Sequence, residues 1–152
     1  MDVYARIKNL DFSLPELPPK GGIYKPVIQV GNLLYVSGQG ATSNGVPVLV
    51  GKVGAERTLE EGQQAAQICA LNALSTLHEY LGDLNKIKRL VKTLGFVASA
   101  PNFNMQPKVI DGASRLLAEI YGEENGIGAR SAIGTNELPG NITVEIEFIF
   151  EI

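Results

Sequence analysis

The sequence is poor in the residues that metal sites and disulfide bonds require. Its 152 residues include one cysteine, one histidine and no tryptophan. Cys69 cannot form a disulfide within the chain, and together with His78 it offers too few soft ligands for a zinc site. We therefore expect no metal and no other cofactor. Because no acid or histidine partner is suggested near Cys69, we interpret it as a packing residue rather than a nucleophile.

Long apolar runs and a basic surface are missing as well. No apolar run approaches the roughly 20 residues that a membrane-spanning helix requires. The segment from Met1 to Leu10 carries Asp2, Arg6 and Lys8 instead of the apolar core of a secretory signal. The formal net charge of -3 offers no footprint for a nucleic-acid backbone. We expect a cytoplasmic protein that binds neither nucleic acid nor membrane.

The residues that are present fit one globular domain covering residues 1–152. Hydrophobic residues make up 45% of the chain and charged residues 19%, which is ordinary for such a domain. Within residues 1–22, Val3 to Leu10 alternates apolar and polar residues and predicts a strand. Leu14 to Lys20 holds three prolines and predicts an extended, proline-rich arm on the surface.

The remaining elements alternate between strands and helices. Strands are expected at 27–30 and 33–37, joined by the Gly31-Asn32 turn, and at 46–50. Thr58 and Glu61 form a capping-box pattern, which predicts a helix that ends at Gly82. A strand over 89–98, a helix from Pro107 to near Gly122 and two further strands complete the order. This order predicts an α+β two-layer sandwich, a β-sheet with both helices packed on one face.

The stretch from Gly128 to Glu147 holds the main candidate site. Arg130 lies among small residues, where its guanidinium has room to bind a small planar anion in bidentate fashion. The alternative is a surface ion pair. In the last strand, Glu145 and Glu147 alternate with apolar residues and should lie on the face that the helices leave uncovered. Ser37 and Gly38 form either a ligand-binding corner or a simple turn.

The order of these motifs resembles the RidA/YjgF (L-PSP) family. The resemblance runs from about residue 23 to the C-terminus. Its elements are Tyr24, V-G-N-L-L-Y-V-S-G-Q over 30–39, Gln63, A-L-N-A-L over 70–74, V-K-T-L-G-F-V over 91–97, A-R-S over 129–131, Leu138-Pro139 and V-E-I-E over 144–147.

The resemblance implies a chorismate-mutase-like fold that assembles as a homotrimer with ligand clefts between subunits. It implies hydrolysis of reactive enamines and imines, such as 2-aminoacrylate, to 2-keto acids and ammonia. By the resemblance, Arg130 binds the substrate carboxylate and Glu145 positions the attacking water. Tyr24, Ser37, Gly38 and Ser131 complete the expected substrate site.

The sequence also departs from the family pattern. Ala132 stands where many members carry cysteine, Lys25-Pro26-Val27 follows the tyrosine, and the segment before the second helix is lengthened. Asn102 and Asn104 are both candidates for the asparagine that members often place in the cleft. Two other functions stay open: a non-catalytic small-carboxylate sensor or carrier, and an endoribonuclease. The acidic chain disfavours the endoribonuclease because no histidine or lysine pair is placed for phosphoryl chemistry.

Overall fold

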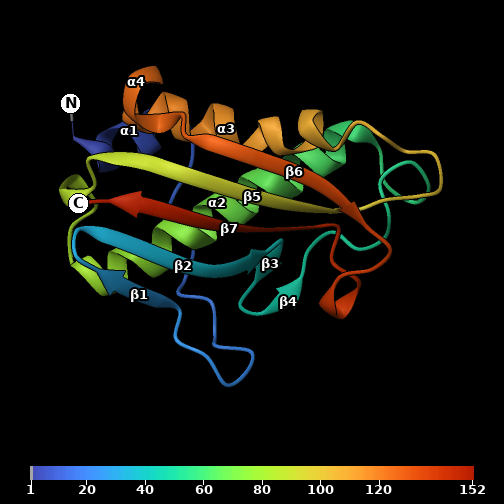
Figure 1. Ribbon diagram of the computed structural model, residues 1–152, viewed down its shortest axis with the longest axis horizontal. Coiled ribbons are helices and arrows are strands. Elements are labelled where there is room, and N and C mark those ends of the chain that lie inside the picture. Colours follow the sequence, from blue (N-terminus) through green and yellow to red (C-terminus); the bar gives the residue numbers. More distant parts are fainter. Residues whose placement is uncertain (1) are drawn as a thin grey trace.

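The computed structural model describes residues 2–152 and contains a five-stranded mixed sheet with two long helices on one face (Figure 1). The strands follow the order β1, β2, β7, β5, β6, and only β5 and β6 run parallel. Their bounds are Val27–Val30, Leu33–Gly40, Val144–Glu151, Arg89–Ala98 and Ala129–Thr135. The covering helices are α2 (Leu59–Leu81) and α3 (Gln106–Tyr121). The expected α+β sheet with helices on one face is confirmed.

Smaller elements fill the corners of this sandwich. The short helix α1 spans Val3–Asn9 and α4 spans Glu123–Gly126, while 3₁₀ turns lie at η1 (Leu84–Lys86) and η2 (Pro139–Asn141). A two-residue pair, β3 (Thr42–Ser43) and β4 (Val46–Pro47), lies beside the main sheet (Figure 1). Among the described residues, no helix is long and apolar enough to cross a membrane.

The ends of α2 form as the sequence predicts. The Thr58 side chain accepts the Glu61 N–H, and the Glu61 carboxylate accepts the Thr58 N–H at 3.1 Å. These bonds satisfy amide donors that the first helical turn would otherwise leave free. Gly82 then ends the helix in the left-handed conformation, with φ of 75°.

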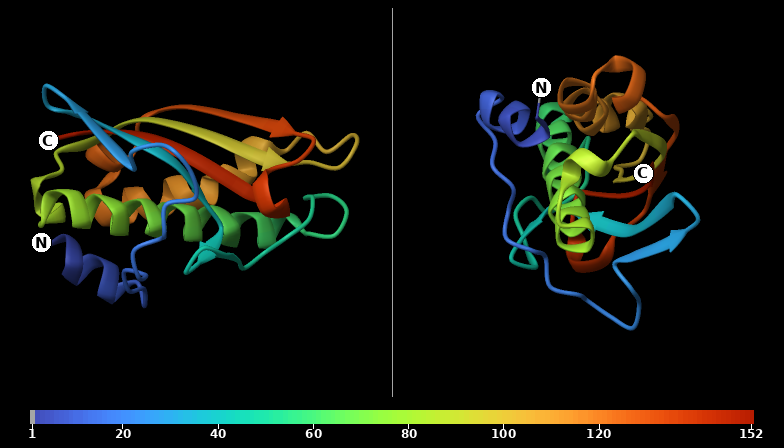
Figure 2. Two further views of the ribbon diagram at one scale, coloured as in Figure 1. Left: turned by 90° about the horizontal axis from the view of Figure 1, so that it is seen from below. Right: turned by 90° about the vertical axis from the view of Figure 1, so that its left-hand side faces the viewer.

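The segment from Val3 to Leu10 was predicted as a strand, and this prediction is wrong. Val3 and Ile7 are buried one helical turn apart, so the apolar spacing fits a helix as well as a strand. Asp2 caps the helix by accepting the Ala5 N–H, and the Arg6 guanidinium donates to the Ile120 carbonyl at the end of α3. This docking on the helical layer, visible in Figure 2, favours the helix over added sheet.

The predicted strand over 46–50 is also wrong for most of its length. Only Val46 and Pro47 lie in a strand, paired with Ser43 and Thr42, and Val50 forms an isolated bridge with Ile142. Pro47 has no N–H to donate, so it can form only part of the hydrogen bonds of a β-ladder. Val48 and Val50 remain exposed, and residues 48 and 49 are irregular chain.

The last strand separates the two faces of the sheet as predicted. Val144, Ile146, Phe148 and Phe150 are buried against the helices, whereas Glu145 and Glu147 point to the uncovered face. Two glycines allow close packing on the helical side. A Cβ on Gly95 would overlap Ile110 of α3, and a Cβ on Gly112 would overlap the Gln63 carbonyl oxygen of α2.

The contact between α2 and α3 at Gly112 provides a test of this packing. Gly112→Ala should destabilise the protein by about 1–3 kcal/mol, because the added methyl meets helix backbone, which cannot rotate away. Urea denaturation measures this change. Gly22→Ala is the matched control, since a Cβ there makes only ordinary contacts with Tyr24. Equal stability of the two variants would contradict the packing described here.

Candidate functional site

A β-bulge in β2 creates the local geometry of the candidate site. Val36 pairs with Phe148 and Gln39 pairs with Ile146, so Ser37 and Gly38 together stand opposite one residue of β7. Such an extra residue re-aims the side chains that follow it. Gln39 accordingly turns inward, is only 7% exposed, and donates from Nε2 to the Ser37 carbonyl at 3.1 Å.

The carboxyl group of Glu145 lies directly against this bulge. A Cβ on Gly38 would be 2.9 Å from Glu145 Oε2 and 3.0 Å from its Cδ. Any larger residue at position 38 would therefore push the carboxyl group out of its place. The Ser37-Gly38 corner is thus a strand bulge, and Gly38 makes room for the Glu145 carboxyl group.

Glu145 is chemically unusual in this position. Burial raises its pKa, and the negative charge of Glu147 raises it further. Its carboxyl group makes no hydrogen bond or ion pair with the residues that the structure describes. A half-buried carboxylate without a partner is a stronger base than an ordinary glutamate and has both oxygens free for a water or a ligand.

A hollow of about 650 Å³ opens beside Glu145 on this side of the molecule. Predicted residues Tyr24, Ser37 and Gly38 border it together with Glu145 and Glu147. The other bordering residues include Pro18, Pro19, Lys20, Gly21, Pro26, Gln39, Thr42, Pro139 and Ile142. Four of the six predicted site residues are therefore gathered here.

The hydroxyl groups at this hollow have defined roles. Ser37 Oγ donates to the Lys25 carbonyl at 2.7 Å, which leaves its lone pairs to accept a hydrogen bond. Tyr24 accepts the Gly21 N–H at 3.1 Å, which leaves its own O–H as a donor toward a ligand. The pair therefore offers one acceptor and one donor beside the Glu145 carboxylate.

Arg130 lies elsewhere in the same protomer. It pairs across β5 with Thr93, which pairs with Phe148, so Arg130 lies on the helical side of the sheet. Its Nη1 donates to Asp111 Oδ1 at 2.8 Å and to Ser114 Oγ at 3.2 Å. It borders a second hollow of about 480 Å³ between α3 and β6. Arg130 and Glu145 therefore point to opposite faces of one sheet.

The other candidates lie apart from the Glu145 hollow. Ser131 is on the uncovered face, where Lys92 Nζ donates to its Oγ at 3.4 Å. Asn102 and Asn104 are exposed in the loop before α3, and Asn102 has a φ of 69°. Neither asparagine borders the Glu145 or the Arg130 hollow.

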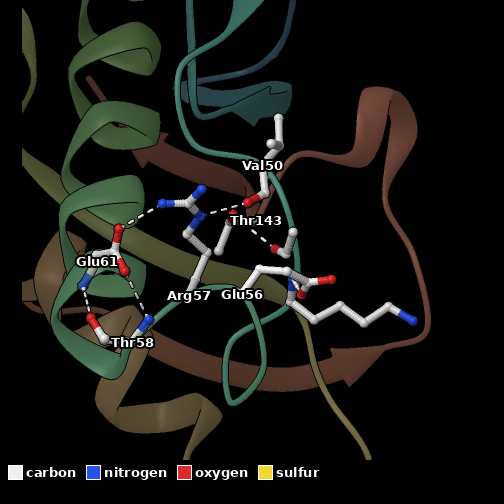
Figure 3. Close-up of polar contacts among 8 residues, drawn as sticks. Val50, Glu56, Arg57, Thr58, Glu61 and Thr143 are labelled. Atoms are coloured by element: carbon white, nitrogen blue, oxygen red, sulfur yellow. Dashed lines mark hydrogen bonds and ion pairs between the residues drawn. The ribbon is translucent and has the colours of Figure 1, made fainter.

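A polar network that the sequence did not predict stabilises the loop before α2 and the chain that enters β7 (Figure 3). Arg57 donates from Nε to the Val50 carbonyl and from Nη1 to Glu61, both at 2.7 Å. The buried Thr143 donates to the Gly51 carbonyl at 2.9 Å. These bonds hold the loop before α2 against the residues that immediately precede Glu145. The spacing of Arg57 and Glu61, four residues apart, was the available signal.

Cys69 is a packing residue, as the sequence predicts. It is fully buried in α2, and its Sγ lies 3.4 Å from the Val144 carbonyl oxygen. Burial, and then the charge of Glu145, raise the pKa of this thiol well above its usual range. Since the thiolate is the nucleophilic form, Cys69 is unsuited to covalent catalysis. The described residues contain no cluster of three or more His, Cys, Asp or Glu side chains for a metal ion.

The fold and this site define a class of protein. Residues 4–150 match the model of the family described as "YjgF/chorismate mutase-like, putative endoribonuclease". The chain belongs to this YjgF family, so the resemblance seen in the sequence is confirmed.

Two proteins and one crystal structure are similar to this chain over most of its length. Protein TCP17 of Trypanosoma cruzi is 38% identical over 99% of this chain and 94% of its own. A 2-iminobutanoate/2-iminopropanoate deaminase of Dermatophagoides farinae is 32% identical over 92% of this chain and 94% of its own. The crystal structure of Atu1372 from Agrobacterium tumefaciens, a protein of unknown function, is 44% identical, with a TM-score of 0.91 over 99% of this chain and 92% of that one.

The contact between Gly38 and Glu145 leads to a prediction about acidity. Gly38→Ala should lower the pKa of Glu145 toward the ordinary value for glutamate, because the added methyl displaces the carboxyl group toward water. Glu147→Gln should lower it less, since burial is the larger cause. Carbon-detected NMR titration of the Glu145 side chain measures both effects. An unchanged pKa in Gly38→Ala would contradict the proposed contact.

Proposed function

We propose that this protein hydrolyses reactive imines of amino-acid metabolism to 2-keto acids and ammonia. The observation that carries the proposal is the unpartnered Glu145 carboxyl group, whose pKa is raised by burial and which rests on the Ser37-Gly38 bulge beside a hollow. The name of the 2-iminobutanoate/2-iminopropanoate deaminase relative supports the same chemistry.

The proposed reaction requires a general base and an oriented water molecule. A protonated imine carbon is already electrophilic, and an enamine reaches that state by taking up a proton on carbon. Glu145 accepts a proton from water as the water oxygen bonds to the imine carbon. The protonated Glu145 then returns this proton to the carbinolamine nitrogen. The C–N bond breaks to release ammonia, and the hydroxyl group gives its proton to the Glu145 carboxylate as the 2-keto acid forms. The donor Tyr24 and the acceptor Ser37 are positioned to orient the water or the carbinolamine.

Arg130 is proposed as the group that binds the substrate carboxylate. Both of its hydrogen bonds with described residues use Nη1, so the edge formed by Nε and Nη2 remains free. That edge has the fork geometry that a carboxylate accepts bidentately. Asp111 and Ser114 then orient the guanidinium rather than block it.

Because Arg130 and Glu145 of one chain face opposite sides of the sheet, the proposed site requires a second copy. The uncovered face carries exposed apolar side chains that suit an interface between copies: Ile28, Val30, Tyr35 and Ile133. We propose a homotrimer in which β6, the edge strand of one subunit, meets the Glu145 hollow of its neighbour, so that Arg130 reaches the hollow from the helical side of this edge and Ser131 from the uncovered side. Sedimentation at micromolar concentration tests this assembly, and a monomeric mass would contradict it.

Removal of the proposed base tests the activity. Glu145→Gln should lower kcat/KM for imine hydrolysis by about 10²–10⁴-fold, the usual contribution of general base catalysis. An amino-acid oxidase supplies the imine, and semicarbazide trapping reports how much of it escapes hydrolysis. Glu119→Gln, an exposed helix residue, is the matched control.

Arg130→Ala separates catalysis from simple binding. It should weaken both turnover and keto-acid binding, whereas Glu145→Gln should reduce turnover alone. Wild-type activity equal to that of Arg130→Ala would overturn the deaminase proposal. Keto-acid binding without turnover on any imine would instead favour a small-carboxylate carrier.

The raised pKa of Glu145 also makes a prediction about stability. The ionised carboxylate lowers the free energy of unfolding above the folded-state pKa, and this penalty disappears below the unfolded-state pKa. Glu145→Gln should therefore raise Tm at pH 8 by roughly 1–3 °C, allowing for the partial exposure of the group. The Tm difference should vanish near about pH 4. Thermal denaturation across this range measures it, and a lower Tm for the variant at pH 8 would contradict the assignment.

A further inference from the structure

The proline-rich arm forms one wall of the Glu145 hollow. Pro18, Pro19, Lys20 and Gly21 all border it. Figure 2 shows this segment passing from the helical layer to the edge of the sheet near β1 and β2. The arm therefore joins two parts of the molecule that are far apart in the fold, and it reaches the candidate site.

The arm is held at three points. Ser75 Oγ of α2 donates to the Pro15 carbonyl at 2.7 Å. The Pro19 ring fills the space over Gly45, where a Cβ would be 2.7 Å from Pro19 Cγ. The Gly21 N–H donates to the Tyr24 hydroxyl at 3.1 Å. Two of these contacts flank residue 20, so the backbone that carries this residue is fixed at the hollow.

Lys20 is the one cation among the described residues that border this hollow. Its ammonium group makes no hydrogen bond or ion pair with the described residues. Glu145 and Glu147 border the same hollow. An unpaired ammonium group at a hollow that is otherwise acidic is available for an anionic ligand group.

We infer that Lys20 determines substrate specificity, and that the preferred substrates are 2-imino acids with a second carboxylate on the side chain. This inference rests on the proposed function. The carboxylate common to all imino acids binds Arg130 of the neighbouring subunit, so Lys20 is left for the far end of the substrate.

Kinetics on a pair of imines test this specificity. An oxidase supplies the imine of glutamate, which carries the second carboxylate, or of norvaline, which lacks it. Lys20→Gln should lower kcat/KM for the glutamate imine by about tenfold, with less than about a twofold change for the norvaline imine. Lys25→Gln, a nearby lysine that borders a different hollow, should leave both within about twofold. Equal effects of Lys20→Gln on both imines, or no effect on either, would overturn the inference.

A double variant excludes a purely electrostatic role for Lys20. If Lys20 served only to balance Glu147, then Lys20→Gln combined with Glu147→Gln would recover wild-type activity on the glutamate imine. We expect no recovery, because the lost contact is to the substrate, and full recovery would overturn the inference.

Binding separates this inference from the proposed reaction. NMR titration with 2-oxoglutarate and with 2-oxopentanoate should show that Lys20→Gln weakens binding of the first keto acid only. If wild type hydrolyses no imine yet shows this difference, the specificity stands and the deaminase proposal fails. If wild type hydrolyses imines but binds both keto acids equally well with and without Lys20, the inference fails and the deaminase proposal stands.

Discussion

The contact between the Glu145 carboxyl group and the backbone of Gly38 is the constraint on which the candidate site depends. The bulge at Ser37 and Gly38 brings the β2 backbone against β7, and the missing side chain of Gly38 leaves the space that the carboxyl group fills. The carboxyl group is partly buried there and lies near the charge of Glu147, and both effects raise the pKa of Glu145. Thr143 donates to Gly51, and Arg57 donates to Val50, which forms a bridge with Ile142, so the chain that enters β7 is held in place as well.

The sheet separates the two chemical groups that the proposed reaction needs. Strand β5 lies between β6 and β7, and the pleat directs Arg130 to the helical side and Glu145 to the uncovered side. No side-chain rotation brings them together within one chain. Catalysis of the proposed kind would therefore require assembly, for which the exposed apolar side chains of the uncovered face are the proposed contact surface.

Much of the fold could be predicted from local signals. The capping box at Thr58, the Gly31-Asn32 turn and the alternation in β7 each specify one structure by short-range chemistry. The secondary structure of residues 3–10 could not be predicted, because their apolar spacing fits the period of a strand and that of a helix. Contacts with α2 and α3 favour the helix. The sequence also placed Arg130 and Glu145 in one stretch, but strand order and pleat, which are long-range properties, put them on opposite faces.

The charges around Glu145 explain why the arm matters to the site. Two carboxylates at one hollow stabilise a protonated imine but repel the carboxylate that every imino acid also carries. In the proposed trimer, Arg130 of a neighbouring subunit would offset that repulsion at one end of the substrate, and Lys20 would offset it at the other. Because Lys20 is carried by an arm anchored on Ser75, Gly45 and Tyr24, its position depends on contacts with the helical layer and the β3–β4 turn as well as on the sheet. Under the proposed function, a change in the arm would therefore alter which imines are bound while the Gly38 and Glu145 geometry remains intact.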